Sequence, residues 1–271
     1  MIRTDLAAEF SMGKSHSGMV VQHLKIPFAV TDVRILTEDA AKEIGKPCGR
    51  YFTVEGLSFS SPLDDFAGTL HALSGLLQQL LPKNVGSALI IGLGNRDITP
   101  DSLGPRAVSQ LLITRHLRDS MPDSAAYGLD RLTPIAALAP GVLGQTGIET
   151  AALVHAVVKE IRPELVIVID ALAAAEKQRL CTSLQLSDTG IAPGSGVKNH
   201  RNALNRETLG VPVIAIGVPT VIALDGMPGM FVTPREVDVC MEHAGKLIGQ
   251  LCNLCLHPDV PLDELMALTG S

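Results

Sequence analysis

Apolar runs and amphipathic stretches alternate along the sequence from Ala88 onward. Short apolar runs predict buried strands, and apolar residues at helical spacing predict helices with one exposed face. The predicted strands are Ala88–Ile91, Ile135–Ala139, Leu165–Ile169, Thr182–Leu186 and Val211–Ile216. The predicted helices are Phe66–Leu81, Pro105–Leu117, Ile148–Ile161 and Pro234–Leu256, the last capped by Thr233, with a further helical turn over Leu262–Leu268. Residues 1–50 are predicted to be irregular, and Tyr51–Val54 to form an edge strand.

This alternation of strands and helices indicates βαβ units and an α/β fold. We expect three layers, with helices on both faces of a mostly parallel central sheet, as in phosphorylase-like and hydrolase-like folds. The chain has 271 residues, of which 46% are hydrophobic, so it is long enough to bury a sizeable core. Trp is absent and aromatic residues make up 3% of the chain, so aliphatic side chains must fill that core.

Composition argues against several classes of protein. The net charge is -6 and the sequence has no block of Lys or Arg, which argues against direct binding to nucleic acid. The sequence has no apolar run long enough to span a membrane and no signal peptide, so we expect a cytoplasmic protein without membrane contact. Five cysteines, an odd number, argue against a disulfide framework.

Two aspartates stand out at the ends of predicted strands. Asp170 directly follows the apolar run Leu165–Ile169, where a buried acid is costly unless it is paired, protonated or used. Asp101 lies in the loop after Ala88–Ile91, just before the next helix. In a parallel sheet both would lie on one rim, among loops rich in Gly and Pro, where ligands bind in open α/β sheets. For each aspartate the alternative is a helix cap.

Other chemistries find less support in the sequence. The stretch Gly92-Leu-Gly-Asn-Arg-Asp97 lacks the third glycine of a dinucleotide fingerprint, and neither a P-loop nor a Gly-x-Ser-x-Gly elbow is present. Cys252 and Cys255 form a lone Cys-x-x-Cys pair within an apolar helical pattern, which favours core packing over zinc. The histidines show no metal-type spacing. His200 is the one near the predicted rim, with substrate binding and a surface position as its two alternatives.

Collinear motifs over most of residues 88–220 resemble the bacterial germination protease family, also called spore protease. These motifs are Gly92-Leu-Gly-Asn95, Thr99-Pro-Asp-Ser-Leu-Gly-Pro105, Ala139-Pro-Gly-Val-Leu-Gly-Gln-Thr-Gly-Ile-Glu-Thr150, Val168-Ile-Asp-Ala-Leu-Ala173, Gln185-Leu-Ser-Asp-Thr-Gly-Ile191 and Leu209-Gly-Val-Pro-Val-Ile-Ala-Ile-Gly-Val-Pro-Thr220. Ile2–Ala7 and Val232–Asp238 match as well. A more distant resemblance, in fold and acid positions, is to the hydrogenase maturation endopeptidases, which bind nickel.

The resemblance implies one peptidase domain over residues 1–271, an atypical aspartic endopeptidase that degrades small acid-soluble spore proteins during germination. The family's two essential aspartates fall on Asp101 and Asp170. It also implies a homo-oligomer, a tetramer in the family, located in the cytoplasm of the forespore or spore core, and it implies no cofactor and no metal. Substrate-binding residues are expected in the rim loops: Asn95, Gly141, Gln145, Thr146, Asp188 and His200.

The stretch Thr4–Phe10 resembles the family's own cleavage sequence, an acid followed by an apolar residue and Ala. Family members are made as zymogens that cut themselves near this point. The resemblance therefore implies a short pro-segment, residues 1–5, removed by a cut between Asp5 and Leu6.

The sequence also departs from the family pattern. Only Val221–Val232 fills a gap where the family usually carries a long insertion, Arg96-Asp97 replaces an aromatic–polar pair, and His200 replaces a Lys. Two alternatives follow. One is a metal-dependent maturation-type peptidase with the same acids as ligands, although carboxylates without His or Cys suit nickel and zinc poorly. The other is an inactive short paralogue that acts as a binding module, against which the intact Asp101 and Asp170 argue.

Overall fold

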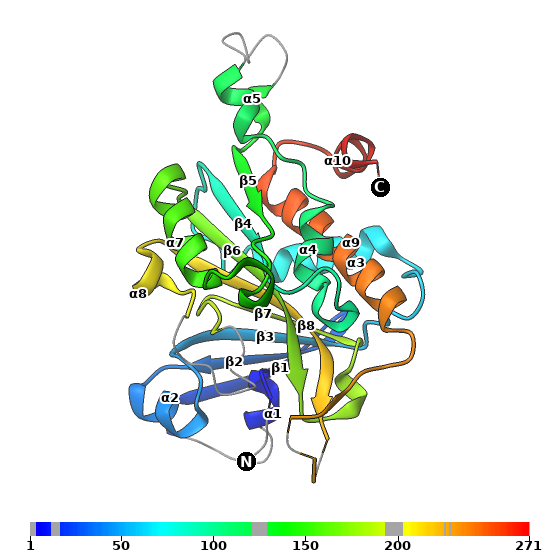
Figure 1. Ribbon diagram of the computed structural model, residues 1–271. Coiled ribbons are helices and arrows are strands. Elements are labelled where there is room, and N and C mark those ends of the chain that lie inside the picture. The colour runs from blue at the N-terminus through cyan, green and yellow to red at the C-terminus, as the bar shows by residue number, and fades with distance from the viewer. Residues whose placement is uncertain are drawn as a thin grey trace.

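The computed structural model describes residues 4–11, 17–120, 129–192, 203–224, 226–227 and 229–270, and these residues build one mixed sheet with helices around it (Figure 1). The strand order is β1-β2-β3-β7-β8-β6-β4-β5, with β9 paired to β8. The strands are β1 (Met19–Ile26), β2 (Phe28–Ile35), β3 (Gly49–Glu55), β4 (Ala88–Gly92), β5 (Ile135–Leu138), β6 (Leu165–Ala174), β7 (Ser183–Ser187), β8 (Val213–Ala223) and β9 (Phe231–Val232). The α-helices are α1 (Ala7–Ser11), α2 (Glu38–Ile44), α3 (Phe66–Leu77), α4 (Leu103–Val108), α5 (Arg115–Ser120), α6 (Leu143–Thr146), α7 (Thr150–Ile161), α8 (Arg206–Leu209), α9 (Val237–Leu256) and α10 (Leu262–Thr269).

The prediction of a mostly parallel sheet is wrong. Among the described strands, β4 pairs in parallel with β5 and β6, and β6 with β8, but the other five pairings are antiparallel. The strand predicted over Thr182–Leu186 exists as β7, yet it runs against β8. An apolar run does not encode the direction in which its strand is inserted, because side chains alternate between the two faces in either direction.

The described part of residues 1–50 is not irregular. β1 and β2 form a long antiparallel hairpin that turns at Pro27, and α2 follows. β3 lies between β2 and β7, so Tyr51–Val54 is an interior segment and β1 is the edge. Side chains of β2 and β3 such as Val33, Ile35 and Tyr51 are buried against α1 and α2. The hairpin therefore extends the sheet well beyond its parallel part.

Helices pack on both faces of the sheet around β4 and β6 (Figure 1). On one face α3, α4 and α9 cover the main core, which includes Ile90 and Ile167. On the other face α7 packs its Val154 and Val158 against Leu89 and neighbouring residues. Burying apolar surface on both faces is the main stabilising contribution to such strands.

Several element ends differ from prediction because tertiary contacts set them. α4 ends at Val108, since buried Asn253 of α9 accepts a hydrogen bond from the Leu112 N–H at 2.9 Å and donates to the Gln110 carbonyl at 3.0 Å. α9 begins at Val237, and the Thr233 hydroxyl donates to the Thr220 carbonyl instead of capping this helix. β6 and β8 continue well past the predicted ends at Ile169 and Ile216.

The described helices include none with both the length and the apolar character needed to cross a membrane.

Candidate active site

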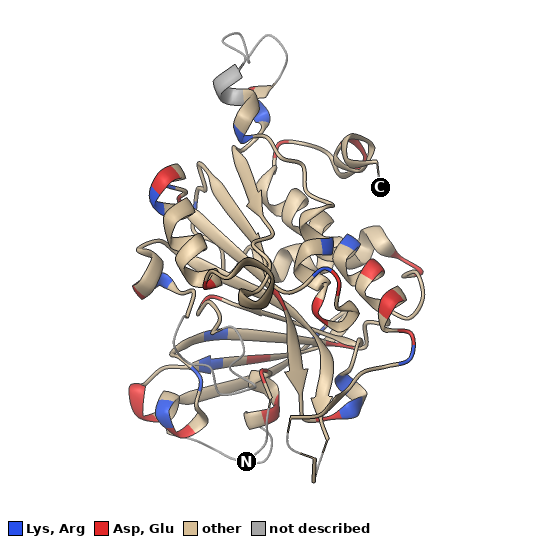
Figure 2. Ribbon diagram, viewed as in Figure 1, with Lys and Arg blue, Asp and Glu red and all other residues tan. Residues whose placement is uncertain are grey.

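Asp170 lies within β6 rather than after it, and its side chain is at the carboxyl half of the parallel strands. Of β4, β6 and β8, whose residues are all described, it is the one charged residue (Figure 2). The residue is 9% exposed, and its Oδ1 accepts a hydrogen bond from the Ala171 N–H at 2.9 Å. Because Asp170 sits in a strand, the helix-cap alternative is wrong for it.

Asp101 reaches the same region through the loop after β4. The Leu93 N–H donates to the Ile169 carbonyl at 2.8 Å, so the loop is tied to the residue directly before Asp170. Asp101 ends a short 3-10 helix, Thr99–Asp101, and its Oδ2 accepts from the Asn95 N–H at 2.7 Å. Ser102 holds the N-cap position of α4, so Asp101 does not cap that helix. The Asp101 carboxylate instead binds within the loop that carries it, through the Asn95 N–H.

The two aspartates line one cavity of about 260 Å³, together with Asp5. Burial raises the pKa of Asp101, opposed by its hydrogen bond from Asn95. Burial also raises the pKa of Asp170 well above its ordinary value, and the charges of Asp101 and then Asp5 raise it further. Close carboxylates resist simultaneous ionisation, so this arrangement favours one proton shared by the pair.

The N-terminal segment reaches this cavity from the side of the sheet where the strands are antiparallel. The Asp5 N–H donates to the Ala173 carbonyl at 2.8 Å, and the Ala173 N–H donates to Asp5 Oδ2 at 2.8 Å. Leu6 is fully buried against Leu172, Ala174 and neighbouring apolar side chains. Residues 4–7 thus lie beside the same strand that carries Asp170, and Asp5, the residue before the predicted cut, lines the cavity of the two aspartates.

Four of the predicted substrate-binding residues lie together over the ends of β4 and β5. Gln145 Nε2 donates to Asn95 Oδ1 at 2.6 Å and to Asp97 Oδ2 at 3.2 Å. Gly141 and Thr146 belong to the same short loop around α6, which begins at Leu143. Asn95 also neighbours the dyad, since its N–H binds Asp101.

The other two predicted residues do not join this group. β7 is antiparallel to β8, so Asp188, which follows β7, lies toward the opposite end of the sheet from the carboxyl ends of β6 and β8. Its Oδ1 accepts from the Arg50 N–H at 2.7 Å instead. His200 falls outside the described residues.

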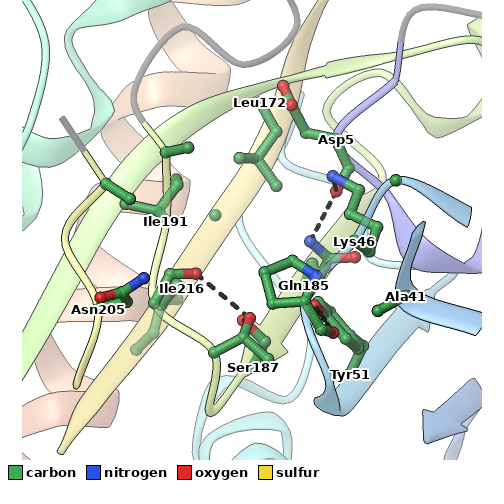
Figure 3. Close-up of a pocket in the computed structure, with 18 of the residues that line it drawn as sticks. Asp5, Ala41, Lys46, Tyr51, Leu172, Gln185, Ser187, Ile191, Asn205 and Ile216 are labelled. Carbon is green, nitrogen blue, oxygen red and sulfur yellow. Dashed lines mark hydrogen bonds between the residues drawn. The ribbon is translucent and has the colours of Figure 1, made fainter. Parts of the chain in front are cut away.

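Gln185 and Lys46 are cavity residues that sequence reasoning missed. Both lie close to Asp5 in a second cavity of about 360 Å³ that adjoins the first, and Asp5 and Leu172 line both (Figure 3). Because β7 is antiparallel to β8, Gln185 occupies this position across the sheet, whereas a parallel β7 would place another residue there. Nothing in the local sequence around Lys46 indicates that α2 packs beside residues 4–10.

The donor set of the cavity does not suit nickel or zinc. Its described lining holds carboxylates but neither His nor Cys, and the described residues contain no group of three His, Cys, Asp or Glu side chains placed to hold a metal. Nickel and zinc favour imidazole and thiolate ligands.

Gly94 sets the position of Asp101, and replacing it with Ala tests that placement. Its φ is +107°, and a Cβ there would lie 2.0 Å from the Asp101 carbonyl oxygen. We expect Gly94→Ala to destabilise the protein by about 1–3 kcal/mol and to lower peptidase activity, since the loop must move. Gly75→Ala, in α3 with open space at its Cβ, is the matched control and should be neutral or slightly stabilising. Denaturant unfolding and activity assays of both variants check this; equal stability of the two would contradict it.

Comparison with known proteins identifies relatives of this chain. A family model described as germination protease matches residues 4–227. The germination protease of Clostridium perfringens (strain ATCC 13124) is 36% identical over 324 aligned positions, covering 97% of this chain and 98% of the relative. That of Caldanaerobacter subterraneus subsp. tengcongensis is 43% identical over 319 positions, covering 98% of each. That of Bacillus subtilis is 40% identical over 263 positions, covering 91% of this chain and 68% of the relative.

The alignment with the Clostridium perfringens protein is longer than the 271 residues of this chain, so that relative carries segments that this chain lacks. Among solved structures, the [NiFe] hydrogenase maturation protease HycI from Thermococcus kodakarensis KOD1 gives a TM-score of 0.39 at 18% identity. It covers 65% of this chain and 97% of that protein.

Proposed function

The chain belongs to the germination protease family and is a peptidase, and from this premise we propose that it is an endopeptidase that hydrolyses small acid-soluble spore proteins during germination. The observation that carries the mechanism is the meeting of Asp101 and Asp170 in one cavity, with the pKa of both raised by burial. Perturbed carboxyl pairs in a cleft are typical of acid–base sites.

The two carboxyl groups divide the work of hydrolysis. Ionised Asp101 takes a proton from a water molecule, whose oxygen attacks the carbonyl carbon of the substrate's peptide bond. Protonated Asp170 gives its proton to the leaving nitrogen as the C–N bond breaks. The products are a carboxylic acid, which ionises to solvent, and an amine. The pair still holds a single proton, now on Asp101, and its return to Asp170 restores the starting state. Deeper burial and two neighbouring carboxylates are the reasons for assigning the proton to Asp170.

The way in which residues 5–7 are held supports the cleavage sequence that the family resemblance implies. The acidic side chain of Asp5 accepts a backbone hydrogen bond from Ala173, and Leu6 fills an apolar site. Ala7 is 1% exposed, so little space is left for a larger side chain. We therefore assign cleavage to sequences with an acid, then an apolar residue, then Ala, and self-processing to the bond between Asp5 and Leu6.

The assignments of a homotetramer and of the spore core as the location rest on the family resemblance. Size measurement of the purified chain by light scattering tests the first of these.

Cleavage mapping tests the proposed function. The purified chain is incubated with a small acid-soluble spore protein, and the fragments are identified by mass spectrometry, with and without a strong chelator. We expect cuts directly after Asp or Glu, before an apolar residue and Ala, at equal rates in both arms. An intact spore protein would overturn the proposed function, and loss of cleavage with the chelator would favour the metal-dependent alternative.

A further inference from the structure

The carbonyl oxygen of Asp5 accepts two side-chain hydrogen bonds. Lys46 Nζ and Gln185 Nε2 each donate to it at 3.0 Å (Figure 3). This oxygen belongs to the peptide bond between Asp5 and Leu6, the bond assigned above to self-processing. Two donors on one carbonyl oxygen, one of them a cation, match the geometry of sites that stabilise an oxyanion.

The strand register fixes Gln185 beside the dyad. Gly217 of β8 pairs with Asp170 on one side and with Gln185 on the other, so the two side chains lie on the same face, two strands apart. Gln185 Oε1 accepts from the Ala7 N–H at 2.8 Å. Because an N–H can only donate and a carbonyl can only accept, these two contacts determine which end of the amide faces Asp5. The amide of Gln185 is therefore held with its NH₂ group on the Asp5 carbonyl.

Lys46 is brought to the site by the end of α2. Gly45 closes that helix in the left-handed conformation, with a φ of 74°, and Lys46 follows it. The Lys46 ammonium lies 5.9 Å from the centre of the Phe10 ring, so the N-terminal segment packs along its side chain. Burial lowers the pKa of Lys46, and the charges of Asp5 and Glu9 oppose that change. Its positive charge therefore acts in a partly desolvated place, where electrostatic effects on a carbonyl are larger than in water.

The bond lies between two cavities. The carboxyl group of Asp5 reaches the cavity of Asp101 and Asp170, whereas its carbonyl oxygen faces the cavity of Lys46 and Gln185 (Figure 3). The dyad and the two donors thus contact different parts of the same residue.

We propose that Lys46 and Gln185 bind the carbonyl oxygen of the Asp5–Leu6 bond and stabilise the negative charge that develops on it during self-cleavage. This role rests on the proposed function above. Attack of water on the Asp5 carbonyl carbon moves an electron pair onto this oxygen, where both donors already point. When the pair returns, the bond to the Leu6 nitrogen breaks, that nitrogen takes a proton from the dyad, and residues 1–5 leave with a new carboxylate.

Anchoring of the N-terminal segment does not account for these two donors. Leu6 is fully buried, and Ala173 binds both the N–H and the carboxylate of Asp5. Glu9 accepts from the Ala175 N–H at 2.9 Å and the Glu176 N–H at 3.0 Å, which holds the far side of the segment. The contacts to the Asp5 carbonyl come in addition to these.

Self-cleavage kinetics of point variants test the proposal. The full chain is made by cell-free translation, and release of residues 1–5 is followed by mass spectrometry from the moment of synthesis. The variants are Gln185→Glu, which keeps the acceptor for the Ala7 N–H and removes the donor, Lys46→Met and Lys46→Arg. Exposed residues of β1 supply the controls Gln22→Glu and Lys25→Met. Amide hydrogen exchange at residues 6–8 reports whether the segment stays bound.

We expect Gln185→Glu and Lys46→Met to slow self-cleavage by about 100-fold or more with unchanged exchange protection. Lys46→Arg should stay within about 10-fold of the wild type, and the controls should be unchanged. Cleavage of Gln185→Glu and Lys46→Met within about 3-fold of the wild type would overturn the proposal, and so would slow cleavage explained by loss of protection. If the wild type itself is not cut after Asp5, this proposal falls, whereas the proposed function is judged separately by the spore-protein assay.

Discussion

Replacing Asp170 by Asn should lower cleavage of a spore protein by about 1000-fold, because Asn cannot give a proton to the leaving nitrogen. The substitution keeps the shape of the side chain and an oxygen that accepts from the Ala171 N–H. Asp64→Asn, at an exposed acid before α3, is the control and should keep full activity. Initial rates measured by mass spectrometry or chromatography give the comparison. An Asp170→Asn protein as active as the control would exclude the dyad mechanism.

The same variant should be more stable than the wild type at neutral pH. The pKa of Asp170 is raised above its ordinary value of 3.8 by burial and by Asp101 and Asp5. An acid whose pKa is raised on folding binds more protons in the folded state, so it weakens stability as pH rises through that window. The difference in melting temperature between variant and wild type should therefore shrink as pH falls toward 3.8. A variant that is less stable than the wild type at neutral pH would contradict a raised pKa of Asp170.

Replacing Arg179 by Met should destabilise the protein by about 3–5 kcal/mol, the usual cost of leaving a buried charge without its partner. The Arg179 side chain is 5% exposed and forms ion pairs with Glu9, Glu55 and Glu176. The Glu9 side chain is 2% exposed, so its carboxylate would stay buried without the neighbouring cation. We expect the melting temperature to fall by roughly 10 °C. The urea concentration at the midpoint of unfolding should also fall.

Two further variants separate the loss of the ion pair from a general effect of removing an arginine. Arg131→Met removes an exposed pair with Glu264, whose side chains are 45% and 41% exposed, and should change stability by less than about 1 kcal/mol. Adding Glu9→Gln to Arg179→Met should restore part of the stability, since no buried charge is then left at residue 9. Equal effects of Arg179→Met and Arg131→Met would contradict a special role for the buried cluster.

The two aspartates were predictable because their signals are local. An acid after a continuous apolar run is costly enough to indicate use, and the loop after Ala88–Ile91 carries the second acid at a short distance along the chain. The structure brings both into one cavity, as expected, although β6 continues past Asp170. The collinear family motifs cover this same part of the sequence, and the family is confirmed by comparison with known proteins.

The surroundings of the dyad were not predictable in this way. Strand direction decides which residue of β7 lies level with Asp170, and the antiparallel insertion of β7 places Gln185 there and removes Asp188. Direction depends on which distant segments pair, and it leaves no mark in the alternation of side chains within one strand. The N-terminal hairpin was missed for a related reason, since its strands are buried only through their pairing with β3 and packing on α1 and α2.

The sequence by itself determined the buried strands β4 and β6, the helices α3, α7 and α9, and the two acids of the candidate dyad, because each of these depends on periodicity or on nearby residues. Only the tertiary structure decided that residues 4–7 lie beside β6 and that Lys46 and Gln185 bind the Asp5 carbonyl. Those contacts join Asp5 to residues 41, 168 and 180 positions away along the chain. They form because burying Leu6 and Glu9 among distant partners stabilises that one arrangement.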